Sequence, residues 1–257
     1  MPTEHGMVDR RSKRAHKTTD LGSPTEICTD SVASIDIEEQ MQQRGYALLP
    51  RVMSATQCDA IVAFYQQDDL FRSHVIMAQH GFGRGEYKYF AYPLPRMIDG
   101  LRQSLYPRLA RIANQWQEQF GIDDRYPSSL SAYLKQCHAA GQSRPTPLLL
   151  RYGQGDFNCL HRDVYGPLLF PLQVAILLSR PGEDFTGGEF VLTEQRPRQQ
   201  SRAAVVPLCQ GDAVVFPVRE RPVMGGKGIY RAQLRHGVSE IHQGNRHTLG
   251  VIFHDAA

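Results

Sequence analysis

The second half of the chain, after Pro147, consists of short β-like runs separated by turn residues. Pairs such as Pro181-Gly182 and Gly187-Gly188 interrupt the runs, which cover residues 148–152, 172–178, 189–192, 203–207, 212–216, 233–239 and 247–253. Many short strands joined by turns are typical of a β-sandwich or a barrel. This half is therefore predicted to form a jelly roll.

The first half has a different pattern, in which longer helical segments dominate. Helices are predicted over residues 34–43, 54–65, 95–120 and 128–139, and short strands over 45–50, 71–77 and 87–92. The longest helical segment carries apolar residues every three to four positions, which predicts a face packed on the core. The residues of this stripe are Met97, Leu101, Leu105, Leu109, Ile112, Trp116 and Phe120. Pro107 interrupts the segment and predicts a break or kink into two helices.

These two patterns predict one α+β domain over residues 34–257. Within it, residues 34–145 would form N-terminal supporting helices, and residues 146–257 the core of a double-stranded β-helix, or jelly roll. Residues 1–33 are polar and contain the basic cluster 10–17. Such a segment buries too little apolar surface to offset its ordering entropy, so a disordered basic tail is expected. A contact with phosphate or an acidic partner is the functional alternative for this tail.

Charge and cysteine content narrow the class of protein. Lys and Arg number 29 against 26 Asp and Glu. The resulting net charge of +3 is weak, so the overall charge does not by itself indicate a nucleic-acid partner. The five cysteines are scattered and form no CxxC pair, which predicts a reducing compartment with buried thiols rather than a thiolate metal site. The sequence contains no long apolar run and no secretory signal, so no membrane partner and a cytoplasmic location are expected.

A glycine-rich loop at residues 81–85 superficially resembles a phosphate-binding loop. A dinucleotide site requires such a loop to open a helix. Here Glu86-Tyr87-Lys88-Tyr89-Phe90 follows, which has the character of a strand. A flexible hairpin near the active site is therefore the preferred interpretation.

Three residues in the β half form a candidate metal site. His161 and Asp163 are two positions apart, so on an extended backbone their side chains point the same way. His236 follows 73 residues after Asp163, and a jelly roll can bring early and late strands together. Two imidazoles and one carboxylate can hold Fe(II) and leave coordination positions open. Because a lone HxD pattern is a weak signal, the site depends on further residues.

Arg246 and Thr248 provide that further signal. They are two apart on a predicted strand and therefore share a face. A buried arginine makes a forked pair with a carboxylate, and a neighbouring hydroxyl can add a hydrogen bond. This combination suits the far carboxylate of a dicarboxylate co-substrate.

Taken together, the motifs resemble those of the iron(II)/2-oxoglutarate-dependent oxygenases with a double-stranded β-helix, in the prolyl-hydroxylase-like branch. The pattern appears in order as Tyr152, Gly155, His161, Asp163, Gly187-Gly188, Gly211-Asp212, His236, Gly244 and Arg246. It covers about residues 148–255. Over residues 45–255 the chain is also similar to a bacterial group of uncharacterised 2-oxoglutarate oxygenases.

The resemblance implies roles for individual residues. His161, Asp163 and His236 would be the iron ligands, Arg246 would pair with the C5 carboxylate of 2-oxoglutarate, and Tyr152 and Thr248 would assist at the co-substrate. On the strand after Asp163, Gln173 is the only polar candidate, and Leu177 stands where the branch often has tyrosine. The implied cofactors are Fe(II), 2-oxoglutarate as co-substrate and O2, with ascorbate as an optional addition. His242, His247 and His254 are expected at the surface or next to the ligands.

The implied activity is a dioxygenase that hydroxylates a C–H bond, and the substrate is open. A protein or peptide side chain such as proline is placed slightly ahead. The alternatives are oxidative demethylation of alkylated nucleic-acid bases, a small-molecule substrate, and a non-catalytic jelly-roll binding or sensor module. For nucleic acid, the candidate phosphate-binding residues are Arg196, Arg198, Arg202, Arg219, Arg221, Lys227, Arg231 and Arg235.

Overall fold

The computed structural model describes residues 35–164 and 166–257, so the expected tail over residues 1–33 lies outside the described part. The α-helices are α2 (Ile37–Arg44), α3 (Ala55–Ala63), α4 (Arg96–Gln119) and α5 (Leu130–Ala139). The first seven strands are β1 (Ala47–Leu49), β2 (Phe71–Ile76), β3 (Gly83–Arg84), β4 (Glu86–Phe90), β5 (Leu148–Tyr152), β6 (Phe157–His161) and β7 (Leu172–Leu177). The later strands are β8 (Phe185–Gly187), β9 (Phe190–Gln195), β10 (Arg202–Val206), β11 (Ala213–Pro217), β12 (Glu220–Gly225), β13 (Gly228–Val238), β14 (Ile241–Gly244) and β15 (Arg246–Val251). None of these described helices combines the length and apolar character needed to cross a membrane.

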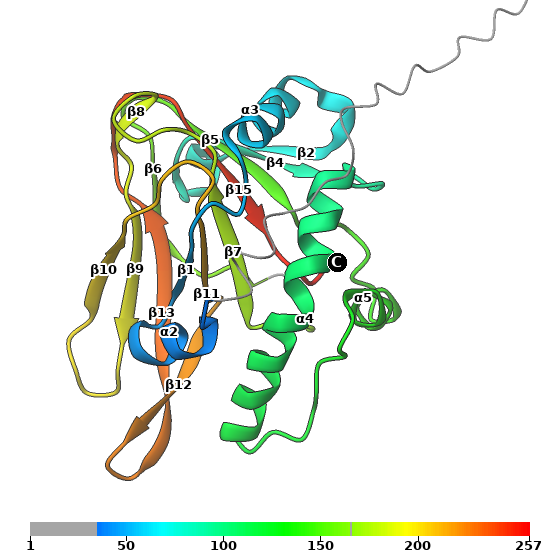
Figure 1. Ribbon diagram of the computed structural model, residues 1–257, viewed down its shortest axis with the longest axis vertical. Helices are drawn as coiled ribbons and strands as arrows, with labels where there is room; N and C mark the ends of the chain where they lie inside the picture. The colour runs from blue at the N-terminus through cyan, green and yellow to red at the C-terminus, as the bar shows by residue number, and fades with distance from the viewer. Residues whose placement is uncertain (1–34, 165) are drawn as a thin grey trace, which may run out of the picture.

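Two antiparallel sheets form the body of the molecule (Figure 1). The seven-stranded sheet has the order β1-β11-β7-β15-β5-β4-β2, and the six-stranded sheet has the order β10-β9-β13-β6-β3 with β12 paired to β13. Strands distant in sequence are neighbours, since β15 lies between β5 and β7, and β13 lies between β6 and β9. This interleaving is the jelly-roll architecture predicted for the second half. Strands β1, β2 and β4, from the supporting region, extend the edges of the seven-stranded sheet.

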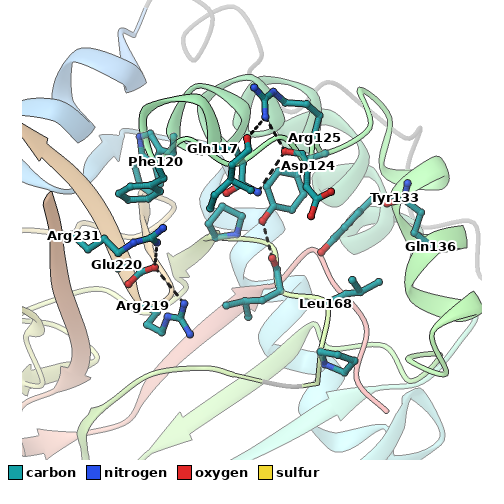
Figure 2. A pocket seen from close by; sticks show the side chains of 16 residues that line it. Gln117, Phe120, Asp124, Arg125, Tyr133, Gln136, Leu168, Arg219, Glu220 and Arg231 are labelled. Carbon is teal, nitrogen blue, oxygen red and sulfur yellow. Dashed lines mark hydrogen bonds and ion pairs between the residues drawn. The ribbon is translucent and has the colours of Figure 1, made fainter. Parts of the chain in front are cut away.

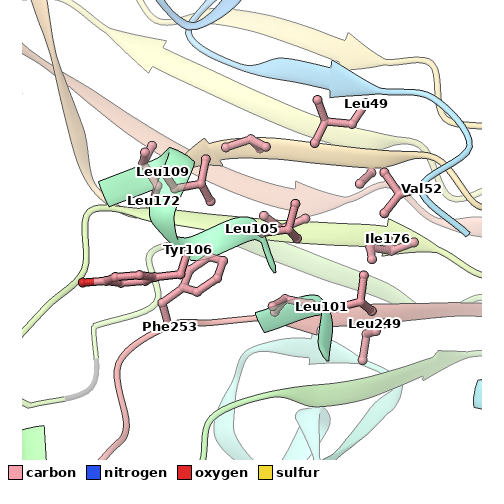
Figure 3. Close-up of a cluster of buried hydrophobic side chains, with 14 of the residues drawn as sticks. Leu49, Val52, Leu101, Leu105, Tyr106, Leu109, Leu172, Ile176, Leu249 and Phe253 are labelled. Carbon is pink, nitrogen blue, oxygen red and sulfur yellow. The ribbon is translucent and has the colours of Figure 1, made fainter. Parts of the chain in front are cut away.

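The outer face of the seven-stranded sheet is covered by α4 (Figures 1 and 3). Alternate side chains of each strand point to this face, and the predicted helical stripe packs on them. Leu101 and Leu105 lie over Ile176 of β7 and Leu249 of β15 in one buried cluster (Figure 3). Each fully buried leucine contributes roughly 1.5–3 kcal/mol, so this layer is a main source of stability. Trp116 belongs to the same cluster, as expected.

The predicted interruption at Pro107 is wrong, because α4 runs without a break from Arg96 to Gln119. Proline removes the hydrogen bond to the carbonyl four residues earlier. That residue, Gln103, and Pro107 itself are both exposed, so water can satisfy the freed carbonyl. The buried stripe on the opposite face packs on the core along both halves of the helix.

Two other expectations need correction. No strand was predicted over residues 157–161, but these residues form β6, which pairs with β13 and β3. Buried thiols are confirmed for Cys58 and Cys137 only, since Cys159 and Cys209 are exposed; these four cysteines are all free. A local signal such as the capping box of Ser54 and Gln57 at α3 was, by contrast, readable directly from the sequence.

Candidate metal centre

A cavity of about 290 Å³ lies between the two sheets. The seven-stranded sheet lines it with residues of β5, β7, β11 and β15, and the six-stranded sheet with residues of β6, β9 and β13. Strand alternation explains its lining: Arg246, Thr248 and Gly250 of β15 face the cavity, whereas Leu249 and Val251 face α4. The predicted site residues Tyr152, His161, Asp163, His236, Arg246 and Thr248 all line this one cavity.

His161, Asp163 and His236 form a compact cluster within it. One ligand atom from each lies within 4.8 Å of the other two. His161 ends β6 and is directly opposite His236 on β13, with ring centroids 4.2 Å apart. The Nε2 atoms of both histidines are 3.3 Å from oxygens of Asp163. Two imidazoles and one carboxylate converging on one point could hold an iron(II) ion on one side.

The electrostatics of the cluster suit a cation. Burial opposes ionisation of Asp163, but the two neighbouring imidazoles outweigh it and hold the pKa of this carboxyl well below its usual range. Burial lowers the pKa of His236, which favours the neutral imidazole that a metal requires. Nδ1 of His161 lies 2.7 Å from the Cys159 carbonyl oxygen. Burial lowers the pKa of His161, but Asp163 and the Cys159 carbonyl outweigh burial and raise it, so a bound cation would take the place of the Nε2 proton that Asp163 favours.

Arg246 lies at one end of the cavity and is 1% exposed. Nη1 of Arg246 donates to Thr248 Oγ1 at 2.6 Å, and the guanidinium lies 5.7 Å from the centre of the Tyr152 ring. Within residues 35–164 and 166–257 no carboxylate forms an ion pair with it, and its Nε has no hydrogen-bond partner. Burial lowers the pKa of Arg246 to about 10, so the side chain remains a cation at neutral pH. A buried guanidinium without an ion-pair partner is costly, so a bound anion would stabilise it.

Some residues of the cavity carried no recognisable signal in the sequence. Asn158 of β6 donates to the Tyr152 hydroxyl at 3.3 Å, and no strand was predicted over this segment. Phe216 and Phe190 pack against the His236 ring, with centroids 4.7 Å and 6.0 Å away. Apolar residues on predicted strands are ordinary core residues, so only the pairing of strands identifies these two as supports of the cluster.

The glycine residues of the motif have structural roles. Gly188 adopts a φ of +64°, and a side chain there would collide with Ile241 and lie 3.0 Å from Arg246 Cδ. Gly83, in the glycine-rich loop, lets β3 approach the Phe157 carbonyl oxygen on β6 more closely than any side chain would permit. The loop therefore serves strand pairing, and the residues after it form β4, as predicted.

The histidines outside the cluster divide into two groups. His242 is exposed and His247 is half-buried, close to expectation. His254 is fully buried in the protein interior, where Phe170 N–H donates to its Nδ1 at 3.3 Å, and it does not line the metal cavity. The expectation of a surface location is therefore wrong for His254, because the chain after β15 turns inward under α4 and α5.

Four of the eight basic residues proposed as phosphate contacts form ion pairs within the described part of the chain. Arg221 is 2% exposed and pairs with Glu194 at 2.7 Å, so it is a structural residue. Arg196 shares Glu194, and Arg219 and Arg231 both pair with Glu220. Arg162 was not among the candidates, but it lines the metal cavity.

A second cavity of about 530 Å³ lies beside the C-terminal end of α4 (Figure 2). Phe120, Tyr126 and Tyr133 line it together with the segment 167–171. The guanidinium of Arg231 stacks on Phe120 at 3.8 Å, and Tyr126 Oη donates to the Leu169 carbonyl at 3.0 Å. It contains none of the metal-cluster residues, so the two cavities are separate sites.

The jelly roll and its cluster of two histidines and one carboxylate define a class, that of mononuclear non-haem iron oxygenases. Comparisons with known proteins agree. A family model described as "Oxygenase, catalysing oxidative methylation of damaged DNA" matches residues 85–256. An uncharacterized protein of Mycobacterium tuberculosis, found in strains CDC 1551 and H37Rv, is 52% identical over 168 residues, which are 65% of this chain and 72% of the relative.

Solved structures support the fold. The non-haem α-ketoglutarate-dependent epimerase SnoN from nogalamycin biosynthesis is similar with a TM-score of 0.52 and 15% identity, over 85% of this chain and 82% of that one. A Trichoplax adhaerens prolyl hydroxylase has a TM-score of 0.51 and 13% identity, over 90% and 95% of the two chains.

The chain belongs to this oxygenase family, among the Fe(II)/2-oxoglutarate-dependent oxygenases, and is an oxidoreductase. Membership implies Fe(II), 2-oxoglutarate and O2 as requirements. It also favours an enzyme over the alternative of a non-catalytic binding module.

Proposed function

We propose that His161, Asp163 and His236 are the iron ligands and that Arg246 binds the C5 carboxylate of 2-oxoglutarate. The bound iron would supply the O2 activation and C–H oxidation that side chains cannot perform. The side chains have the remaining tasks: Asp163 contributes negative charge, the two imidazoles complete one face, and the apolar walls exclude water.

The observation that carries this proposal is the state of Arg246. A guanidinium that is 1% exposed, has no counter-ion among the described residues and lines the same cavity as the cluster is what a dicarboxylate co-substrate needs. Thr248 and Tyr152 support it from the same end of the cavity: Thr248 accepts a hydrogen bond from Arg246, and the Tyr152 ring lies beneath the guanidinium.

For the primary substrate we propose an alkylated nucleic-acid base, oxidised at its alkyl carbon. Arg162 lines the metal cavity, and Arg235 is the charge that acts on it most strongly. These two guanidiniums offer contacts for phosphates. Phe82, which also lines the cavity, is 47% exposed and stacks on His80 at 5.3 Å, offering an aromatic surface for a base. The description of the family model, which refers to damaged DNA, supports the same choice.

Hydroxylation of a peptide side chain such as proline, which the sequence placed slightly ahead, is the competing substrate class. The prolyl hydroxylase likeness supports the fold alone at 13% identity, so it adds nothing to this choice. Ascorbate dependence belongs to the same set of assays and is measured by adding or omitting it.

The first experiment tests the site. Anaerobic addition of Fe(II) and 2-oxoglutarate to the protein should produce a visible charge-transfer absorption, and air should then yield succinate. His161→Ala should lose both signals. An exposed histidine away from the cavity, as in His242→Ala, is the matched control and should keep them. Unchanged absorption and succinate release in His161→Ala would contradict the assignment.

The second experiment tests the substrate class. Succinate and formaldehyde release are measured with single-stranded oligonucleotides carrying methylated bases and, in parallel, with proline-containing peptides. Formaldehyde formed with the oligonucleotides supports base demethylation. Succinate release stimulated only by peptides would replace it with peptide hydroxylation.

A further inference from the structure

Gln173 is a polar residue in an otherwise apolar strand, β7. It lines the metal cavity and is 2% exposed. Its Nε2 is fully buried and has no hydrogen-bond partner in the described part of the chain. Buried polar groups are nearly always hydrogen-bonded, because an unpaired one destabilises the folded state. An unpaired amide that borders a cavity is therefore a candidate to bind a ligand.

A second buried glutamine shows what a structural role looks like in this protein. Gln142 is 0% exposed, like Gln173 almost entirely inaccessible. Its Nε2 donates to the carbonyl oxygens of Leu168 at 3.0 Å and Asp255 at 2.6 Å, and its Oε1 accepts from Leu168 N at 2.7 Å. Gln142 links separate chain segments, whereas the Nε2 of Gln173 donates to no group in the described part of the chain.

Strand register places Gln173 close to the metal cluster. It is directly opposite Phe216 on β11, and the Phe216 ring lies 4.7 Å from the ring of His236. The other end of the cavity is marked by Thr248, which is opposite Leu177. Gln173 and Leu177 are four positions apart, a distance of about 13 Å along β7.

This spacing separates Gln173 from the carboxylate that Arg246 and Thr248 would hold, which lies beyond the reach of the Gln173 amide. The sequence suggested Gln173 as a polar neighbour of the co-substrate, and the register moves it to the end where the C–H bond to be oxidised must lie.

We propose that the Gln173 carboxamide positions the primary substrate beside the metal cluster. An amide presents one donor and one acceptor side by side, so it selects a group with the complementary pair. The edge of a base that carries an amino group next to a ring nitrogen or carbonyl has this pair, and glutamine reads such edges in nucleic acids. A base flipped into a pocket is identified through hydrogen bonds of this kind. The inference rests on the proposed function of the cavity.

The test compares Gln173→Met, which keeps the volume, and Gln173→Glu with the wild-type enzyme. The probe is a single-stranded oligonucleotide carrying one 1-methyladenine. The 2-oxoglutarate Kd, measured from the anaerobic absorption, should change less than about twofold in Gln173→Met. The KM for the oligonucleotide should rise about tenfold or more, and the formaldehyde formed per succinate should fall. Gln142→Met is the matched control: its thermal midpoint should fall while its KM stays unchanged.

Each alternative outcome is decisive. A large rise in the 2-oxoglutarate Kd of Gln173→Met would assign the amide to the co-substrate and overturn the proposal. Unchanged kinetics with a raised thermal midpoint would overturn it too, leaving only an unsatisfied amide. If the wild-type enzyme oxidises a peptide instead of the oligonucleotide, the nucleic-acid proposal fails, and the same KM comparison with that peptide decides the role of Gln173. A wild-type protein that does not bind 2-oxoglutarate overturns both proposals.

Discussion

Replacing Arg246 by methionine removes the guanidinium and keeps most of the apolar stem. In the structure this side chain donates to Thr248 Oγ1 and meets no carboxylate among the described residues. A hydrogen bond to a charged group contributes about 1.5–3 kcal/mol. Loss of a forked pair with the C5 carboxylate should therefore cost about 3–5 kcal/mol of binding. Since 1.4 kcal/mol is a factor of ten, the Kd of 2-oxoglutarate should rise by roughly two to three orders of magnitude.

Although Arg246→Met should weaken 2-oxoglutarate binding, it should not lower the free energy of unfolding of the ligand-free protein. Breaking a buried ion pair normally destabilises a protein, because an unpaired charge remains. Arg246 has no paired carboxylate to leave behind, so Arg246→Met should keep or raise the stability. Arg246→Lys retains the charge but cannot form the bidentate pair. Its Kd for 2-oxoglutarate should therefore lie between those of the wild-type protein and Arg246→Met.

The measurement is an anaerobic titration of the Fe(II)-loaded protein with 2-oxoglutarate, combined with urea unfolding of the ligand-free protein. A Kd that changes less than about threefold in Arg246→Met would refute the assignment of the carboxylate. A marked loss of stability would refute the claim that the guanidinium is uncompensated in the ligand-free fold.

Three further predictions concern stability. Burial lowers the pKa of His254 to about 4, so neutral His254 contributes up to roughly 3 kcal/mol of stability that is lost as pH falls from about 6.5 to 4. In urea titrations across that pH range, the free energy of unfolding of His254→Asn should fall less than that of the wild-type protein. Pro107→Ala restores a helical hydrogen bond to the exposed Gln103 carbonyl, and the free energy of unfolding should rise by about 1–2 kcal/mol; a decrease would show that proline is favourable there. Arg221→Met leaves Glu194 with only part of its counter-charge and should lower the free energy of unfolding by about 3 kcal/mol. The nucleic-acid affinity of the folded protein should not change. A loss of affinity at constant stability would instead show that Arg221 contacts phosphate.

Local patterns predicted much of the secondary structure. The apolar stripe of α4 and the Ser54 cap depend on residues within a few positions of one another, so the sequence displays them directly. The errors occurred where distant contacts override local preference. Pro107 stays inside a helix because the buried face of α4 holds it, and β6 is a strand because β13 and β3 pair with it.

The candidate site shows the same division. The sequence by itself determined the chemistry: two histidines and an aspartate for a metal, and Arg246 with Thr248 two positions apart for a carboxylate. Period-two alternation on a strand made that second pair predictable. Only the tertiary structure decided that His236 is opposite His161, that Arg246 has no counter-ion, that Arg221 is buried against Glu194, and that Gln173 lies near the metal cluster with an unpaired amide. Each of these depends on which strands pair and in what register, and register between strands tens of residues apart is set by the packing of the whole sandwich.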